Sequence, residues 1–297
     1  MPLTWVNRWV INASGRVNIH VFSLLLVTLV WGATFPILKI ATAQLSGVEV
    51  CALRFVIAAL CMAPFAWRVP RRTWLDGGLL GALVLVSYVL QAYGLQTISS
   101  NRSAFLTSLN VLMVPFLGVL FGNRLRPLAV AAAALACAGI ALMSWEGGAD
   151  LWADLATVLG ALGYALYVIV LSHRASHHAP RQLAATQTVW MAVLGCVWMV
   201  CSAWGSAGGL ETLQSLPQRV DLEIFLGLLY LGAVATAAML FLQARAQRHV
   251  SANQAALIYA MEPVFAAMFA WVWLAEGLGA MAAVGAVLVV IAVVLGG

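Results

Sequence analysis

Long apolar segments recur along the whole chain, each about as long as a membrane is thick, with short polar connections between them. A hydrocarbon core about 30 Å thick needs roughly 20 apolar residues in a helix. Only 8% of the residues are charged, whereas a soluble domain carries about 25%. Such a chain cannot cover an apolar core with a polar surface. We therefore expect one all-α integral membrane unit without a separate soluble domain.

Ten segments have the length and apolar character of a membrane-spanning helix. Their approximate ranges are 20–41, 48–67, 74–96, 102–122, 126–145, 153–173, 181–204, 221–243, 251–274 and 278–296. The first is longer than the core of a signal peptide, so we expect it to be retained as a span. The five cysteines lie inside apolar runs without metal-ligand spacing, and we interpret them as buried small hydrophobic residues.

Basic residues predict the orientation of these spans. With the N-terminus inside the cell, 11 of the 15 Lys and Arg residues fall on the cytoplasmic side. These are Arg8, Arg16, Arg68, Arg71, Arg72, Arg124, Arg126, Arg174, Arg181, Arg245 and Arg248. The positive-inside rule then places both termini in the cytoplasm. The net charge of +5 is explained by contact with anionic inner lipids, so we expect no nucleic-acid partner.

The two halves of the chain have matching layouts. A gap-free alignment of 103–125 with 254–276 pairs Ala104 with Ala255 and Leu106 with Leu257. These are the fourth and ninth expected spans, and each carries a proline within it. Two related units with five spans each must enter the membrane in opposite directions. We therefore expect residues 1–149 and 150–297 to form inverted five-helix repeats around a central cavity, as in many secondary transporters.

Four stretches carry a resemblance to a known family. They read "WGATFPILK" from Trp31, "ALRF" from Ala52, "YGLQTISSNRSAFLTSLNVLMVP" from Tyr93 and "VSANQAALIYAMEPVFAAMFAWVWLAEGL" from Val250. Together they resemble the drug/metabolite transporter superfamily, in particular its ten-span branch of EamA-type metabolite exporters and, within that branch, the bacterial aromatic amino acid exporters. The resemblance implies export of small metabolites across a bacterial inner membrane.

Glu262 and Pro263 stand near the middle of the ninth expected span. At 1.5 Å per residue, Glu262 is roughly 16 Å deep if the helix begins near Ser251. A carboxylate at that depth must face protein or water, or stay protonated, and the proline opens the helix locally. Glu262 could bind an ammonium group, relay a proton, or serve as a structural hydrogen-bond acceptor. We interpret the pair as marking the wall of a cavity.

Aromatic and polar side chains deep inside other spans are further candidates for a cavity lining. The candidate substrate-binding residues are Trp31, Thr34, Tyr88, Gln91, Thr107, Asn110, Tyr164, Tyr167, Tyr230, Tyr259 and Glu262. Pro115 and Pro263 are the candidate gating residues. Helix packing alone is the alternative for each of them. Arg54 could bind a substrate carboxylate or pair with an acid, and we favour a structural role for it.

The expected function is transport of small neutral or amphipathic metabolites, above all aromatic and other bulky neutral amino acids, by alternating access. The expected partners are a small-molecule substrate and the lipid bilayer, and we expect the monomer to be functional. We expect no cofactor, metal site or catalytic residue, because the chain lacks a P-loop, HExxH or GxSxG motif. The alternatives are a drug or other metabolite carrier of the same superfamily and an intramembrane lipid-modifying enzyme.

Overall fold

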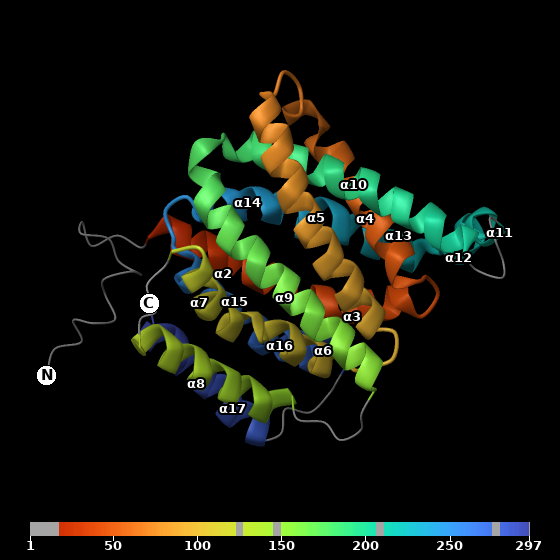
Figure 1. The fold of residues 1–297 in the computed structure, drawn as a ribbon. Coiled ribbons are helices and arrows are strands. Elements are labelled where there is room, and N and C mark those ends of the chain that lie inside the picture. Colours follow the sequence, from red (N-terminus) through yellow and green to blue (C-terminus); the bar gives the residue numbers. More distant parts are fainter. Residues whose placement is uncertain (1–17, 123–126, 145–149, 206–210, 275–279, 297) are drawn as a thin grey trace, which may run out of the picture.

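The computed structural model describes residues 18–122, 127–144, 150–205, 211–274 and 280–296, and these residues contain helices and no strand. Figure 1 shows them as one bundle of helices. The first part of the chain forms α2 (Ile19–Gly32), α3 (Thr34–Thr42), α4 (Gly47–Met62), the 3-10 turn η1 (Ala63–Phe65), α5 (Arg71–Gly94), α6 (Ser100–Ser108), α7 (Asn110–Leu120) and α8 (Pro127–Ser144). The prediction of an all-α protein is confirmed for the part of the chain described.

The second part of the chain continues with further helices. They are α9 (Leu151–Arg174), the 3-10 turn η2 (Ala175–His177), α10 (Pro180–Trp204), the short α11 (Glu211–Gln214) and α12 (Leu216–Arg219), α13 (Leu222–Leu229), the π-helix η3 (Tyr230–Ala238), α14 (Met239–Ala246), α15 (Ala252–Tyr259), α16 (Glu262–Leu274) and α17 (Ala280–Gly296). The helices agree closely with the apolar segments expected from the sequence.

Seven helical stretches within the described residues are long and apolar enough to cross a membrane. They are Ile19–Thr42, Gly47–Phe65, Arg71–Gly94, Arg102–Leu120, Leu151–His177, Pro180–Trp204 and Leu222–Ala246. Pro127–Leu142 and Ala283–Leu295 are shorter apolar helices. The expected ninth span consists of α15 and α16, which are separated by a break in the helix. The total of ten spans therefore stays a prediction, as does the division into inverted repeats.

Local sequence signals start several of these helices. Ser46 before α4 and Ser251 before α15 each form a capping box with the residue three positions later, Glu49 and Gln254 respectively. These side chains satisfy backbone N–H groups that have no partner inside the helix. Asp150 caps α9 as a simple N-cap, with its side chain accepting from the backbone N–H of Ala153. Helix starts therefore follow from short stretches of sequence.

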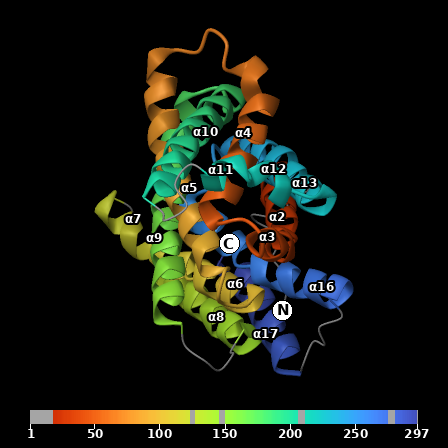
Figure 2. The same ribbon diagram turned by 90° about the vertical axis from the view of Figure 1, so that its right-hand side faces the viewer.

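Residues far apart in sequence pack closely along α5. Figures 1 and 2 both show α5 beside α9 and α10, and the shorter pair α8 and α17 together at the lower edge. Where α9 crosses α5, a β-carbon added to Gly160 would lie 2.9 Å from the carbonyl oxygen of Ser87. A larger side chain has no room there. The glycine therefore lets the two backbones approach, as small residues commonly do between membrane helices.

Two helix interruptions occupy corresponding places in the two halves. One lies at Leu109, between α6 and α7, and the other at Ala260 and Met261, between α15 and α16. The gap-free alignment derived from the sequence pairs Leu109 with Ala260. Pro263 lies in the first turn of α16, where its missing N–H is tolerated. Pro115 lies inside α7, where it removes one backbone donor.

Ion pairs tie the two parts of the chain together near both ends of the bundle. At the end expected to face outward, Arg102 pairs with Asp154 at 2.5 Å and Arg219 pairs with Glu49 at 2.5 Å. At the opposite end, Asp76 on α5 accepts from Arg174 and contacts His178.

Several residues that predict the orientation, namely Arg8, Arg16, Arg124 and Arg126, lie outside the described residues.

Candidate functional site

A small polar cavity lies inside the apolar bundle. Nine residues line it: Trp31, Thr34, Arg54, Ser87, Tyr88, Gln91, Thr107, Tyr164 and Glu262. They come from α2, α3, α4, α5, α6, α9 and α16. The free volume is about 20 Å³, close to the roughly 10–15 Å³ that one water molecule needs. A molecule larger than a few atoms does not fit into this volume unless the lining helices move apart.

Three aromatic rings form one wall of this cavity and the layer behind it. The ring centroids of Trp31 and Tyr164 are 5.9 Å apart, and Tyr259 lies 5.6 Å from Trp31 and 6.0 Å from Tyr164. These separations are typical of favourable aromatic pairs. The indole N–H of Trp31 donates to the carbonyl of Ala235 at 2.7 Å. The wall is therefore fixed in place by both packing and a hydrogen bond to η3.

Hydroxyl and amide groups form the polar part of the lining. Gln91 donates from its side-chain amide to the hydroxyl of Thr107 at 3.1 Å, which joins α5 to α6. The hydroxyl of Thr34 donates to the carbonyl of Trp31 at 2.7 Å, next to the point where α2 gives way to α3. The lining thus combines rings with a few hydrogen-bonding groups, which suits an amphipathic ligand.

Two buried groups of opposite formal charge also line the cavity. Arg54 on α4 is 3% exposed, and Glu262 at the start of α16 is 8% exposed. The guanidinium of Arg54 donates to the hydroxyl of Thr236 at 2.9 and 3.1 Å and to the carbonyl of Leu231 at 3.4 Å. Among the described residues, neither Arg54 nor Glu262 takes part in an ion pair. Each of these two groups is therefore buried without an ion-pair partner among the described residues.

The π-helix η3 is held against α4 by these same contacts. The hydroxyl of Thr236 donates to the carbonyl of Leu231, five residues earlier, at 2.7 Å. A β-carbon on Gly232 would lie 2.7 Å from the carbonyl oxygen of Arg54, so the glycine permits a close approach. Because π-helices are rare and occur often at functional sites, η3 is a candidate for a segment that changes conformation.

A chain of buried hydrogen bonds lies next to the aromatic wall. Gln187 donates to the hydroxyl of Tyr167 at 3.1 Å, and Tyr167 donates to the side-chain oxygen of Gln243 at 3.0 Å. The amide of Gln243 donates in turn to the hydroxyl of Tyr164 at 3.1 Å. This chain connects α10, α9 and α14. The side-chain oxygen of Gln187, at the start of this chain, is buried without a hydrogen-bond partner.

The structure brings most of the residues expected from the sequence into one place. Seven of the nine lining residues were expected, namely Trp31, Thr34, Tyr88, Gln91, Thr107, Tyr164 and Glu262. Arg54, for which a structural role was favoured, and Ser87 complete the lining. A basic residue inside an apolar span was the available signal for Arg54. The part that any of them plays in binding stays a prediction.

The remaining expected residues lie around the cavity rather than along it. Asn110 donates to the carbonyl of Thr107 at 2.6 Å, at the helix interruption. Tyr167 belongs to the hydrogen-bond chain, and Tyr259 packs against Trp31. Tyr230 donates to the carbonyl of Val30 at 3.0 Å and borders an apolar groove between α3 and α13 with a volume of about 400 Å³. Pro115 and Pro263 are buried near the two interruptions. Gln187 and Gln243 were missed, although a glutamine within an apolar span was a usable signal.

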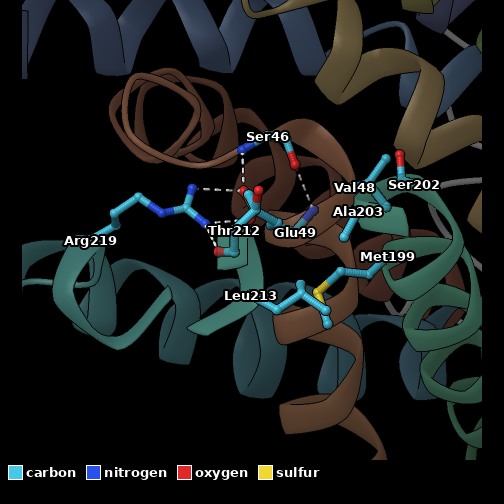
Figure 3. Close-up of a pocket in the computed structure, with 9 residues that line it drawn as sticks. All are labelled: Ser46, Val48, Glu49, Met199, Ser202, Ala203, Thr212, Leu213 and Arg219. Carbon is cyan, nitrogen blue, oxygen red and sulfur yellow. Dashed lines mark hydrogen bonds and ion pairs between the residues drawn. The ribbon is translucent and has the colours of Figure 1, made fainter. Parts of the chain in front are cut away.

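A second pocket, with a volume of about 250 Å³, lies at the end of the bundle expected to face outward. Figure 3 shows Arg219 beside Glu49 and Ser46 in this pocket, with Met199 and Leu213 on its apolar side. The Glu49 carboxylate, which accepts hydrogen bonds from the guanidinium, raises the pKa of Arg219. Arg219 and Glu49 therefore stabilise each other in their charged forms. At the start of α9, a hydrogen bond from the Thr97 side chain lowers the pKa of Asp150.

Comparisons with known proteins agree with this architecture. The model of the EamA-like transporter family matches residues 18–145 and 151–296. An uncharacterized transporter from Archaeoglobus fulgidus is 27% identical over 275 residues, covering 92% of this chain and 83% of the relative. A probable amino-acid metabolite efflux pump from Salmonella typhimurium is 27% identical, covering 72% of this chain and 73% of the relative. The corresponding pump from Escherichia coli is 25% identical and covers 71% and 72%. One crystal structure superposes with a TM-score of 0.73 at 17% identity, covering 94% of this chain and 97% of that one, which shows a shared fold.

Proposed function

Because this chain belongs to the EamA-like transporter family, we propose that it exports small amphipathic metabolites, above all neutral amino acids with bulky side chains. The observation that carries this proposal is the polar cavity within the apolar bundle, which side chains from both family-matched segments line. Rings, hydroxyls, an amide and two charges surround it. In an amino acid bound here, the polar amino and carboxyl groups would contact the polar lining groups, and the apolar side chain would contact the rings.

The proposed mechanism is alternating access around this cavity. The two parts of the chain act as inverted repeats, a proposal supported by the corresponding interruptions at Leu109 and Ala260. In many secondary transporters, interrupted membrane helices form the substrate site at the interface of two repeats. Pro115 and Pro263, close to these points, are proposed to act in gating. The two repeats rock against each other and expose the cavity first to one side and then to the other.

The closed contacts on either side of the cavity fit this mechanism. The aromatic wall and the chain from Gln187 to Tyr164 would close the path to the cytoplasm. The pairs of Arg102 with Asp154 and of Arg219 with Glu49 would hold the outer end. Full opening on either side requires one of these sets to separate. The protein is proposed to work as a monomer in a bacterial inner membrane, with both termini in the cytoplasm.

The name of the two bacterial relatives, probable amino-acid metabolite efflux pump, supports amino acids as the cargo.

We propose downhill exit, because the cavity holds one carboxylate, Glu262, and no acidic or histidine relay partner among its lining residues. Proton-coupled export is the other outcome of the test. A drug or other metabolite carrier and a lipid-modifying enzyme are the competing functions.

Counterflow in proteoliposomes tests the proposal. Vesicles containing the purified protein are loaded with unlabelled amino acid and exposed to a trace of the labelled one, at equal and at unequal pH across the membrane. We expect accumulation of bulky neutral amino acids at equal pH, with little added effect of a pH gradient. Protein-free vesicles are the control. Absence of counterflow for every amino acid by a folded protein would exclude the proposed cargo class, and dependence on the gradient would replace downhill exit by proton coupling.

A further inference from the structure

We propose that Arg54 and Glu262 bind the two charged ends of a zwitterionic cargo, so that a molecule must carry a carboxylate and an ammonium group together to be transported efficiently. This inference rests on the proposed function, since it assumes that the central cavity is the transport site. Beyond the proposed function, it names the two residues that select the cargo and the chemical groups that the cargo must carry.

The guanidinium of Arg54 faces the cavity with part of its bonding capacity unused. Its Nε and one terminal nitrogen donate to the hydroxyl of Thr236, and that terminal nitrogen also donates to the carbonyl of Leu231. Within the described residues, the other terminal nitrogen donates to no protein group, and no carboxylate pairs with the guanidinium. The planar guanidinium is suited to recognise a carboxylate. The contacts with η3 fix its orientation, so the unused edge is available to a ligand.

Glu262 offers the opposite charge from a different helix. It is the first residue of α16, directly after the interruption at Ala260 and Met261. Its side chain is almost fully buried, lines the cavity, and makes no hydrogen bond or ion pair with another described residue. A carboxylate in the first turn of a helix is favoured by the helix dipole. It can therefore accept from an ammonium group that enters the cavity.

The two charges are separate from each other, although they line the same cavity. Within the described part of the chain, no ion pair joins Arg54 to Glu262. The guanidinium carbon of Arg54 lies 4.9 Å from the ring centroid of Tyr88, so a ring occupies one face of the guanidinium. A buried guanidinium or carboxylate without a partner of opposite charge is unfavourable in an apolar bundle. A ligand with one charge of each sign can compensate both.

The remaining lining explains why the rest of the cargo should be apolar. Trp31 and Tyr164 present ring surfaces to the cavity. Once the carboxylate and the ammonium group of an amino acid are bound, its side chain is left to contact these rings. A ligand with only one charge would leave the opposite protein charge buried and unpaired, which lowers its affinity sharply.

Competition by matched analogues in the unmodified protein is the first test. Labelled phenylalanine is the cargo, and the competitors are unlabelled phenylalanine, 3-phenylpropionate, which lacks the ammonium group, and phenethylamine, which lacks the carboxylate. We expect each analogue to compete roughly 10- to 150-fold more weakly than phenylalanine, the range for leaving one charged hydrogen-bonding group unpaired. Analogues that compete as well as phenylalanine would overturn the inference and leave the proposed function standing. Absence of phenylalanine transport together with all other amino acids would instead remove the proposed function.

Two variants assign the selectivity to the two residues. Glu262→Gln should lose its discrimination against 3-phenylpropionate and keep that against phenethylamine, and Arg54→Gln should show the reverse. Glu223→Gln and Arg248→Gln change the same charges at exposed positions outside the cavity and should keep the unmodified pattern. A variant that folds without transporting is compared by ligand-induced thermal stabilisation with the same three compounds. Unchanged discrimination in both cavity variants would show that other residues select the cargo.

Discussion

Replacing Trp31 by phenylalanine separates the hydrogen bond of the indole from the packing of its ring. Trp31 is 4% exposed and lines the cavity. Its indole nitrogen donates to the carbonyl of Ala235 in η3 at 2.7 Å. Phenylalanine keeps an aromatic ring but has no donor, so the contact between α2 and η3 loses its hydrogen bond. We expect this variant to fold and to transport more weakly.

The size of the effect follows from the contacts. Loss of a buried hydrogen bond that leaves an acceptor unpaired costs about 1–3 kcal/mol of unfolding free energy. Trp31→Ala also removes the ring packed against Tyr164 and Tyr259 at 5.9 and 5.6 Å, for a total loss of about 3–5 kcal/mol. If the ring contacts cargo, its removal costs about 0.5–1.5 kcal/mol of binding, or roughly 2- to 12-fold in half-saturation.

Two other tryptophans provide matched controls. Trp190 donates from its indole to the carbonyl of Trp74 at 3.0 Å, away from the cavity, so Trp190→Phe removes the same kind of hydrogen bond without touching the site. Trp67 is 76% exposed, so Trp67→Phe changes only the surface. Thermal unfolding in detergent reports stability, and counterflow at several cargo concentrations reports half-saturation. Transport by Trp31→Ala equal to that of both controls would refute an aromatic-lined transport site.

Three further predictions concern packing, charge and orientation. Gly160→Val should lower the unfolding free energy by about 1–3 kcal/mol, measured by thermal unfolding, because an added β-carbon meets the carbonyl of Ser87 at 2.9 Å. The lowered pKa of Asp150 means that the folded state favours the ionised carboxylate. The stability that this carboxylate contributes is therefore present above the ordinary aspartate pKa and is lost as the pH falls below it. Asp150→Asn should show a smaller acid-induced drop in melting temperature. In a cysteine-free background, a membrane-impermeant maleimide applied to intact cells should label Gln218→Cys and leave His177→Cys unlabelled.

Each of these measurements has an outcome that contradicts its premise. An unchanged melting temperature for the valine variant would mean that α5 and α9 are farther apart than described. If the melting temperature of Asp150→Asn falls in acid as much as that of the unmodified protein, Asp150 does not stabilise the fold as a charged cap. Labelling of His177→Cys in intact cells would reverse the predicted orientation of the spans.

The positions of the helices, and the interruption in the ninth expected span, could be predicted largely from local sequence, whereas the interruption at Leu109 was not foreseen. Apolar length fixes where a helix can lie in a membrane, and a capping residue such as Ser46 or Ser251 fixes where it starts. Pro263 indicated the interruption in the ninth expected span, which the structure places directly before Glu262. The π-helix η3 was not foreseen, because it depends on contacts between Thr236, Leu231 and Arg54.

The candidate site was only partly accessible from the sequence. Tyr164 and Tyr167 lie one helical turn apart, and both were expected to line the cavity, yet Tyr164 lines it and Tyr167 hydrogen-bonds to Gln243 instead. Arg54 was open to several roles, because sequence spacing does not show whether an acid lies beside it. Which polar residue faces which neighbour depends on the rotation of each helix within the bundle.

The sequence by itself determined that this protein lies in a membrane, how long its helices are and which polar residues lie within them. These properties depend on residues that are neighbours along the chain. Tertiary structure alone decided that Arg54 and Glu262 line one cavity without pairing, and that Tyr230 and Asn110 lie outside it. Those relations join helices more than a hundred residues apart, as in the bond between Trp31 and Ala235. They are set by close packing between helices, which apolar periodicity does not encode.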